Sequence, residues 1–261
     1  VPRIVSQVFL QSNTIIITAI ASTLASGSIA IFNFANNLQS LPVGIIGASF
    51  AVASFPALSS AWVNGQKEKF LENFSSAFRQ IVYAIVPICL AVFFLRVHIV
   101  RVILGTGEFG WWETRLTAAA LGLFVLGIFR YSLIILLARV FFSLNDTRTP
   151  AGTTVCSVIL NIVLSLWFTS LLKSANFFQT FLMNIFDLKG VENISVVGLP
   201  LAFSIAFTVQ LILLVIFLYR KIGDFKLKEI YLSLTKVIIA ALLMMVSIYF
   251  SLRILAQVFD L

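Results

Sequence analysis

The sequence predicts an all-α fold, a polytopic membrane helix bundle with about seven transmembrane helices. Hydrophobic residues make up 60% of the chain and charged residues only 11%, whereas about a quarter of the residues in a soluble domain are charged. No Asp, Glu, Lys, Arg or His occurs between Arg3 and Lys67. That stretch is long enough for two membrane crossings of about 20 residues each. The bilayer is therefore the expected solvent for most of the chain.

Apolar runs between charged or Gly/Pro-rich breaks predict the individual helices. They cover residues 4–24, 31–62, 78–95, 116–144, 153–172, 196–219 and 231–255. Because this number of crossings is odd, the two termini should lie on opposite faces of the membrane.

The distribution of Lys and Arg between the two faces predicts the orientation. The face with the N-terminus would carry Arg3, Lys67, Lys69, Arg79, Arg139, Arg148, Arg220, Lys221, Lys226, Lys228 and Lys236. The other face would carry Arg96, Arg101, Arg115, Lys173, Lys189 and Arg253. Cytoplasmic loops carry the excess of basic residues, so the N-terminus is predicted to be cytoplasmic. These residues lie between hydrophobic runs and form no patch with interleaved aromatics, so the net charge of +8 does not indicate a nucleic-acid partner.

Two connectors have the spacing of surface helices. Phe70, Phe74 and Phe78 recur every four residues while the charged residues of this connector take the other faces. This pattern is typical of a helix that lies at the membrane interface. The stretch 177–188 has a similar but less regular pattern. Both connectors are either interface helices or merely solvated segments.

Polar residues recur at helical spacing along three predicted helices, which gathers them on one face of each. These sets are Gln7, Gln11, Thr14 and Thr18 in the first helix, Asn33, Asn36, Asn37, Ser40, Gly44 and Gly47 in the second, and Thr154, Ser157, Asn161 and Ser165 in the fifth. Such faces either line a hydrated pathway or hold a dry bundle together through interhelical hydrogen bonds. Interhelical bonding is the commoner use of Ser and Thr, and both alternatives stay open for the three asparagines.

Arg130 lies near the middle of the predicted helix 116–144. A cation at that depth costs several kcal/mol unless water, an anion or another partner meets it. Arg130 is either functional, with an anionic substrate as its partner, or an arginine that snorkels or pairs with backbone carbonyls. All acidic residues fall in connectors or at helix ends, so the sequence gives no support to an intramembrane proton relay.

No motif predicts an enzyme. His98 is the single histidine, and no cysteine accompanies it at metal-ligand spacing. The sequence contains no G-x-S-x-G elbow and no glycine-rich phosphate loop. We therefore expect no catalytic residue, no metal site and no cofactor.

Several segments resemble the MurJ (MviN) lipid II flippase family of the multidrug/oligosaccharidyl-lipid/polysaccharide exporter superfamily. The sharpest match is Asn-Asp-Thr-Arg-Thr-Pro at 145–150, which is similar to the family's cytoplasmic turn between its tenth and eleventh helices. The other matching segments are Pro2-Arg3 with Gln11 and Asn13, 25–28, 41–45, 55–59, 107–109, 114–121 and 198–202. Their order and spacing extend the resemblance nearly end to end.

The resemblance implies a fourteen-helix transporter with two lobes, of which this chain would be a MATE-like second part. Residues 1–220 would form the second six-helix lobe, and residues 221–261 an additional helix, the thirteenth. The first lobe and the fourteenth helix would be absent. The chain opens with Val1-Pro2-Arg3 and has neither an initiator Met nor a signal peptide, so we expect it to be a fragment.

The implied activity is flipping of lipid II, the undecaprenyl-pyrophosphate-linked peptidoglycan precursor, across the bacterial cytoplasmic membrane by alternating access. Lipid II and membrane lipids are the implied partners, and the oligomeric state is not predicted. The alternatives are export of a drug or another lipid-linked oligosaccharide or polysaccharide by the same superfamily, and a non-transporting membrane scaffold.

The expected substrate-binding residues combine two cations with three amides. We expect Arg3 and Arg130 to attract the pyrophosphate, and Asn33, Asn36 and Asn37 to contact the polar head. The family commonly has an acid and an arginine where this sequence has Asn36 and Asn37. That departure removes a charge expected to meet the pyrophosphate.

Overall fold

A computed structural model of the chain describes residues 2–105, 107, 109–174, 176–188, 190–191, 193–223 and 227–258. Only the backbone is described at 2, 3, 5, 227–232, 252 and 254–258.

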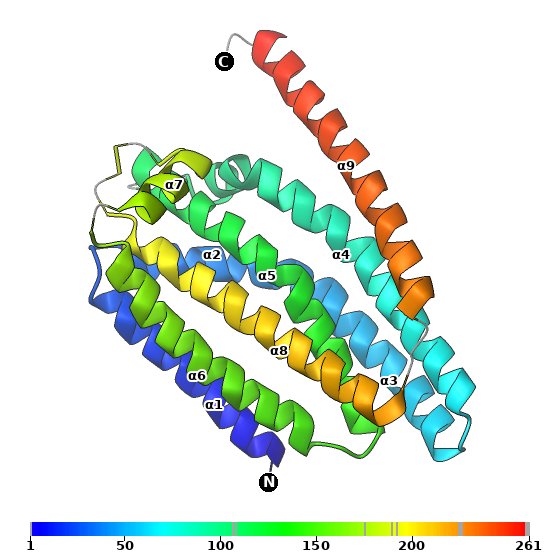
Figure 1. Ribbon diagram of the computed structural model, residues 1–261. Helices are drawn as coiled ribbons and strands as arrows, with labels where there is room; N and C mark the ends of the chain where they lie inside the picture. Colours follow the sequence, from blue (N-terminus) through cyan, green and yellow to red (C-terminus); the bar gives the residue numbers. More distant parts are fainter. Residues whose placement is uncertain are drawn as a thin grey trace.

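Within these ranges the chain is helical and contains no strand (Figure 1). The elements are α1 (Pro2–Ser22), α2 (Ser28–Pro42), the π-helical η1 (Val43–Ala48), α3 (Ser49–Val63), α4 (Lys67–Leu104), α5 (Trp111–Ser143), α6 (Arg148–Leu171), α7 (Phe177–Ile185), the 3-10 turn η2 (Ser195–Val197), α8 (Gly198–Ile222) and α9 (Leu227–Val258). Among the described residues, six stretches are long and apolar enough to cross a membrane. α1 adds a helix of 21 residues, about 30 Å long. The predicted all-α bundle with about seven crossings is therefore confirmed.

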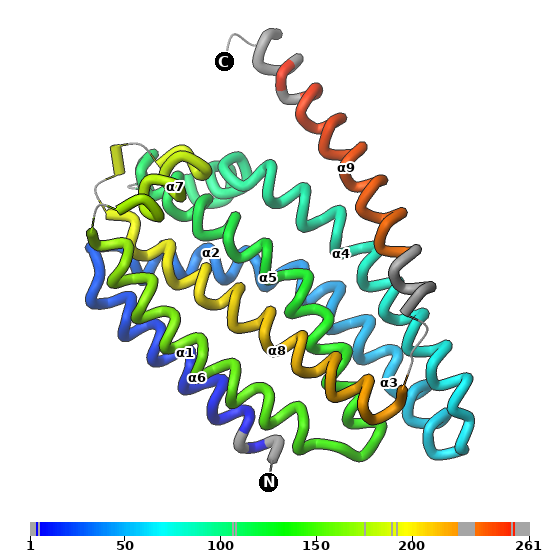
Figure 2. The backbone as a smooth tube through the Cα atoms, in the orientation of Figure 1, coloured from blue at the N-terminus to red at the C-terminus, as the bar shows by residue number. Residues whose placement is uncertain are grey.

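Successive long helices run in opposite directions through the bundle (Figures 1 and 2). We call the end where α1 begins, with the turns at 64–66 and 144–147, the N-terminal face. The turn at 23–27 and the C-terminal end of α4 lie at the opposite face, together with α7. α9 leads from the N-terminal face toward the opposite one, so the chain enters and leaves the bundle at different ends, as predicted.

The second predicted span is one continuous helical stretch with a change of pitch in the middle. α2 ends at Pro42, and the π-helical η1 follows before α3 resumes the α-helix. The change of pitch comes directly after Pro42, a residue that has no N–H to donate and that commonly occurs where a helix bends. A Cβ on Gly47 would lie 2.7 Å from the Ser132 Oγ. Glycine therefore allows η1 to approach α5 closely.

α5 forms the centre of the bundle, where it packs against α2, α3, α4 and α8. Its Phe124 ring lies 5.6 Å from the Phe32 ring of α2 and 5.2 Å from the Phe203 ring of α8, measured between centroids. Lipid tails are as apolar as these side chains, so close packing, and not the removal of apolar surface from water, stabilises such contacts.

The prediction of a separate connector before the third span, either an interface helix or a solvated segment, is wrong. α4 begins at Lys67 and continues without a break to Leu104. Phe70 and Phe74 are fully buried, and the Phe70 ring lies 5.3 Å from the Trp62 ring of α3. The four-residue period therefore marks the buried stripe of a long helix in an α3–α4 hairpin, because packing against a neighbouring helix requires the same spacing as contact with lipid.

The second predicted surface helix forms as α7, and its position in a membrane interface stays a prediction. The side chain of Leu182 is buried and the Phe178 ring stacks on Phe168 of α6. Phe177, Phe181 and Ile185 are exposed on another side of the helix. α7 is thus fixed to the bundle and leaves one apolar stripe uncovered.

Candidate functional site

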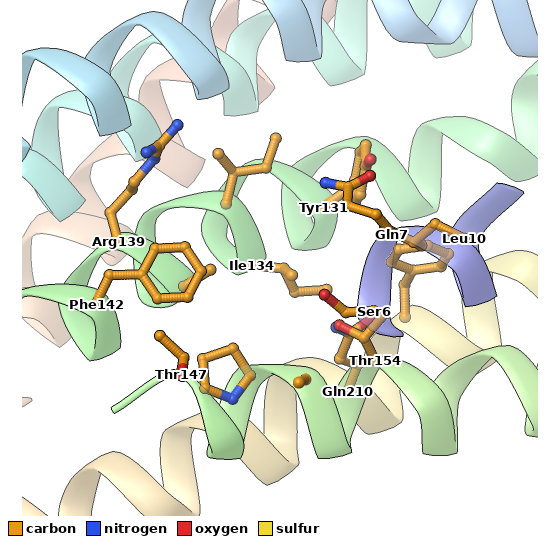
Figure 3. Close-up of a pocket in the computed structure, with 15 residues that line it drawn as sticks. Ser6, Gln7, Leu10, Tyr131, Ile134, Arg139, Phe142, Thr147, Thr154 and Gln210 are labelled. Carbon is orange, nitrogen blue, oxygen red and sulfur yellow. The ribbon is translucent and has the colours of Figure 1, made fainter. Parts of the chain in front are cut away.

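A cavity of about 230 Å³ lies between α1, α5, α6 and α8. Figure 3 shows Arg139 at one end of it, Gln7 and Tyr131 at the other, and Thr154 and Gln210 along one side. The polar groups come from four different helices. The cavity can therefore form hydrogen bonds with a ligand from several directions.

Among the residues whose side chains the structure describes, Arg139 is the one charged residue that lines this cavity. It lies in the last turns of α5, toward the N-terminal face, and its guanidinium carbon is 5.9 Å from the centre of the Phe55 ring of α3. Sequence reasoning counted Arg139 only as a basic residue of that face. Its position inside the predicted span 116–144 was the available signal, since a cation within a span is a candidate functional group.

The polar stripe of α6 serves interhelical bonding. The Ser157 hydroxyl donates to the Ala206 carbonyl of α8 at 3.1 Å. The Asn161 amide donates to Asn13 Oδ1 of α1 at 3.0 Å. These bonds favour the dry alternative for most of this stripe. Thr154 takes part in interhelical bonding and also lines the cavity. Its hydroxyl accepts a hydrogen bond from the Gln210 side chain of α8 at 3.1 Å.

The polar stripes of α1 and α2 are not buried in this way. Gln7, Gln11 and Thr14 are exposed on α1. The buried side of α2 carries Ser28, Ile31, Phe32, Ala35 and Gln39. The exposed Asn37 and Ser40 lie on the other side. These two helices therefore present amides and hydroxyls on surfaces within the span of the bundle.

The three predicted asparagines lie within two turns of α2. Asn33 and Asn36 are half-buried, and Asn37 is exposed. The Asn36 Oδ1 accepts a hydrogen bond from the Gln39 side chain at 3.0 Å. Asn33 and Asn37 are thus the members of this group best placed to contact a ligand.

The two predicted arginines have different standing in the structure. The side chain of Arg3 lies outside the described residues. Arg130 is half-buried near Cys89 of α4, and it donates a hydrogen bond to the Leu126 carbonyl of its own helix. Arg130 is not among the residues that line the cavity with Arg139. Its role in substrate binding stays a prediction.

The turn at 144–147 contains a capping network centred on Asp146. Its carboxylate accepts bonds from the backbone N–H groups of Arg148 and Thr149 at 3.1 and 3.0 Å, where α6 begins. It also pairs with Lys221 Nζ of α8 at 2.6 Å. Burial acts to raise the pKa of Asp146, but the bonds from Lys221 and Thr149 outweigh it and lower the pKa from 3.8 to about 2. The turn is thereby tied to both α6 and α8.

Comparisons with known proteins agree with this architecture. The sequence profile of the family described as "Lipid II flippase MurJ" matches residues 1–261. A probable lipid II flippase MurJ from Borreliella burgdorferi is 28% identical over 89% of this chain and 41% of its own length. One from Buchnera aphidicola subsp. Acyrthosiphon pisum is 26% identical over 95% of this chain and 44% of its own length. The chain thus spans less than half the length of these relatives.

Two solved structures share the fold. Lipid II flippase MurJ in an inward closed conformation has a TM-score of 0.74 and 22% identity, covering 94% of this chain and 46% of that one. An outward-facing multidrug resistance MATE family transporter of the MOP superfamily has a TM-score of 0.65 and 15% identity, covering 98% and 53%. These matches confirm the predicted MATE-like fold. From the match of the family profile over its whole length, this chain belongs to the lipid II flippase MurJ family.

Proposed function

We propose that the protein translocates lipid II across the bacterial cytoplasmic membrane by alternating access. Its family and its curated relatives carry the name of this activity. Translocation moves the polar head while the lipid tail stays in the bilayer, and no covalent bond is made or broken. The proposed role is therefore transport without a catalytic step.

The observation that carries the proposal is the difference between the polar stripes of α6 and those of α1 and α2. In α6, the Ser157 hydroxyl and the amide N–H of Asn161 donate hydrogen bonds to neighbouring helices. On α1 and α2, Gln11 and Asn37 remain exposed within the span of the bundle. An amide in contact with lipid tails would lack hydrogen-bond partners. A hydrated passage for a sugar-bearing head group provides such partners.

The division of the chain and its orientation are part of the proposal. We assign residues 1–220 to the second six-helix lobe and residues 221–261, the segment that contains α9, to the additional thirteenth helix. The exposed faces of α1 and α2 would look across a central passage toward a first lobe. The N-terminal face is cytoplasmic, in keeping with the excess of Lys and Arg at that end.

The proposed substrate contacts extend over the polar surface of the passage. Asn33, Asn36 and Asn37 contact the polar head, and Arg3 and Arg130 attract the pyrophosphate. Asn33 and Asn37 give the sharpest test, because neither has a hydrogen bond to a neighbouring helix among the described residues, so their replacement should leave the packing intact.

The test replaces both Asn33 and Asn37 by Leu in the full-length protein and measures lipid II translocation in proteoliposomes. We expect at least a ten-fold lower rate with unchanged thermal stability, because the passage loses two amides that meet the head group. The matched control is Ile159→Leu, a change at an exposed residue of α6, which should keep the wild-type rate. An undiminished rate in the double variant would remove these asparagines from the passage, and a wild-type protein that never translocates lipid II would refute the function itself.

A further inference from the structure

The lining of the cavity that contains Arg139 combines one positive charge with uncharged polar groups. Apart from this guanidinium, the polar lining that the structure describes consists of neutral hydroxyl and amide groups, among them Gln7, Thr154 and Gln210. No described carboxylate lines the cavity. The cavity is therefore a positively charged compartment with additional hydrogen-bonding groups.

Arg139 has no hydrogen bond or ion pair to any residue that the structure describes, and its one marked contact is with the Phe55 ring. Arginines at the opposite face have more partners. Arg115 pairs with Asp187 at 3.1 Å, and Arg101 donates to the Phe109 carbonyl at 3.3 Å. A guanidinium beside the membrane core requires water or an anion to offset its desolvation.

Asp146, the acidic residue closest to Arg139 in the sequence, does not serve as that anion. Asp146 follows α5 by three residues, but its carboxylate is held by Lys221, Arg148 and Thr149. Its pKa of about 2 keeps it ionised and committed to these bonds. Among the residues that the structure describes, nothing neutralises the charge of Arg139, which leaves it available to a ligand.

The position of Arg139 restricts the kind of anion. It lies in the last turns of α5, a helix long and apolar enough to cross a membrane, so we expect it near the level where lipid head groups meet water. The abundant anions at that level are phosphate esters, and the planar fork of arginine binds phosphate oxygens with two parallel hydrogen bonds. The neutral groups deeper in the cavity match the hydroxyls and amides of a sugar.

From this geometry we propose that the cavity between α1, α5, α6 and α8 binds the phosphate of a lipid head group, with Arg139 as its anionic subsite. This inference rests on the proposed function where it names the source, a polyprenyl pyrophosphate that enters from the N-terminal face. Gln7, Thr154 and Gln210 contact the adjoining polar part of the head. Arg139 thus receives the head group before the passage along α1 and α2 carries it across.

The test measures binding of a polyprenyl pyrophosphate and of the uncharged polyprenol to the full-length protein in nanodiscs of neutral lipid. The variants are Arg139→Gln and Arg139→Lys, and the control is Arg220→Gln, which removes an exposed arginine of α8 outside the cavity. We expect Arg139→Gln to weaken binding of the pyrophosphate at least ten-fold and Arg139→Lys to weaken it less, because lysine keeps the charge but loses the fork. Polyprenol binding and the control should change less than two-fold.

Competition identifies the source of the phosphate. If an excess of phosphatidylglycerol displaces the probe in an Arg139-dependent way, the subsite takes lipid phosphate in general; if it does not, the subsite selects the pyrophosphate-linked lipid. Equal binding of the pyrophosphate by wild type and Arg139→Gln would overturn the proposal. Arg139-dependent binding in a protein that fails to translocate lipid II would refute the function and leave the subsite standing, so the two failures are distinguishable.

Discussion

At the scale of single residues, the polar groups of this bundle divide into those that are satisfied internally and those that are not. Asn161 and Ser157 bond to neighbouring helices, whereas Asn37 and Arg139 have no such bond among the described residues. In a bilayer an unsatisfied polar group is costly, so its persistence points to a ligand or to water. Asp146 is the clearest example of the first group, because its carboxylate bonds to Arg148, Thr149 and Lys221.

Asp146→Asn should lower the free energy of unfolding at neutral pH by about 1–2 kcal/mol, because the amide loses the ion pair with Lys221 and weakens the cap of α6. The folded pKa of Asp146 is lowered from 3.8 to about 2. Its contribution is therefore fully present above about pH 4 and is lost as the pH falls toward 2. Thermal unfolding in detergent at pH 7 and at pH 3 measures this, and the variant and the wild type should differ less at pH 3.

A double-mutant cycle with Lys221→Met isolates the ion pair. The double variant should be about as stable as Asp146→Asn alone, since that change already removes the ion pair with Lys221. Strictly additive losses would show that the two residues act independently, contrary to the 2.6 Å contact.

At the scale of secondary structure elements, similar sequence periods led to two different environments. Phe70 and Phe74 repeat every four residues and are buried between α3 and α4. Phe177, Phe181 and Ile185 repeat at the same spacing and are exposed on α7. The period indicates that one face is apolar, but it does not indicate whether protein or lipid covers that face. For α7 the uncovered stripe calls for a direct measurement.

We expect Phe181 to lie in the lipid interface and its neighbour Thr180 to lie nearer to water. One residue rotates the helix by about 100°, so the two positions differ in depth if α7 lies flat with its apolar stripe inward. A fluorophore on Phe181→Cys, in a Cys89→Ala, Cys156→Ser background, should be quenched several-fold more by spin-labelled lipid than one on Thr180→Cys. Equal, weak quenching at both positions would place α7 in water.

At the scale of the whole molecule, the sequence predicted the crossings, but it did not indicate which side chains share a cavity. The crossings follow from long apolar runs such as 4–24 and 196–219, because the hydrocarbon thickness of the bilayer sets a length that can be read along the chain. Which helix faces meet depends on packing, which a single sequence does not encode at any one position. Arg130 and Arg139 illustrate the difference, since they belong to the same predicted span but only Arg139 lines the cavity.

The orientation of the molecule can be tested at the two faces that the helices define. Asn64, in the turn at 64–66, and Ser26, in the turn at 23–27, are both exposed and lie at opposite ends of the bundle. With the N-terminal face cytoplasmic, a membrane-impermeant maleimide should label Ser26→Cys in intact cells, and Asn64→Cys only after lysis, both in the background without native cysteines. The reverse pattern would invert the orientation and would place Arg139 and its cavity on the outer side, where a precursor made in the cytoplasm could not enter. This labelling therefore decides whether the proposed phosphate subsite is an entry point for the substrate.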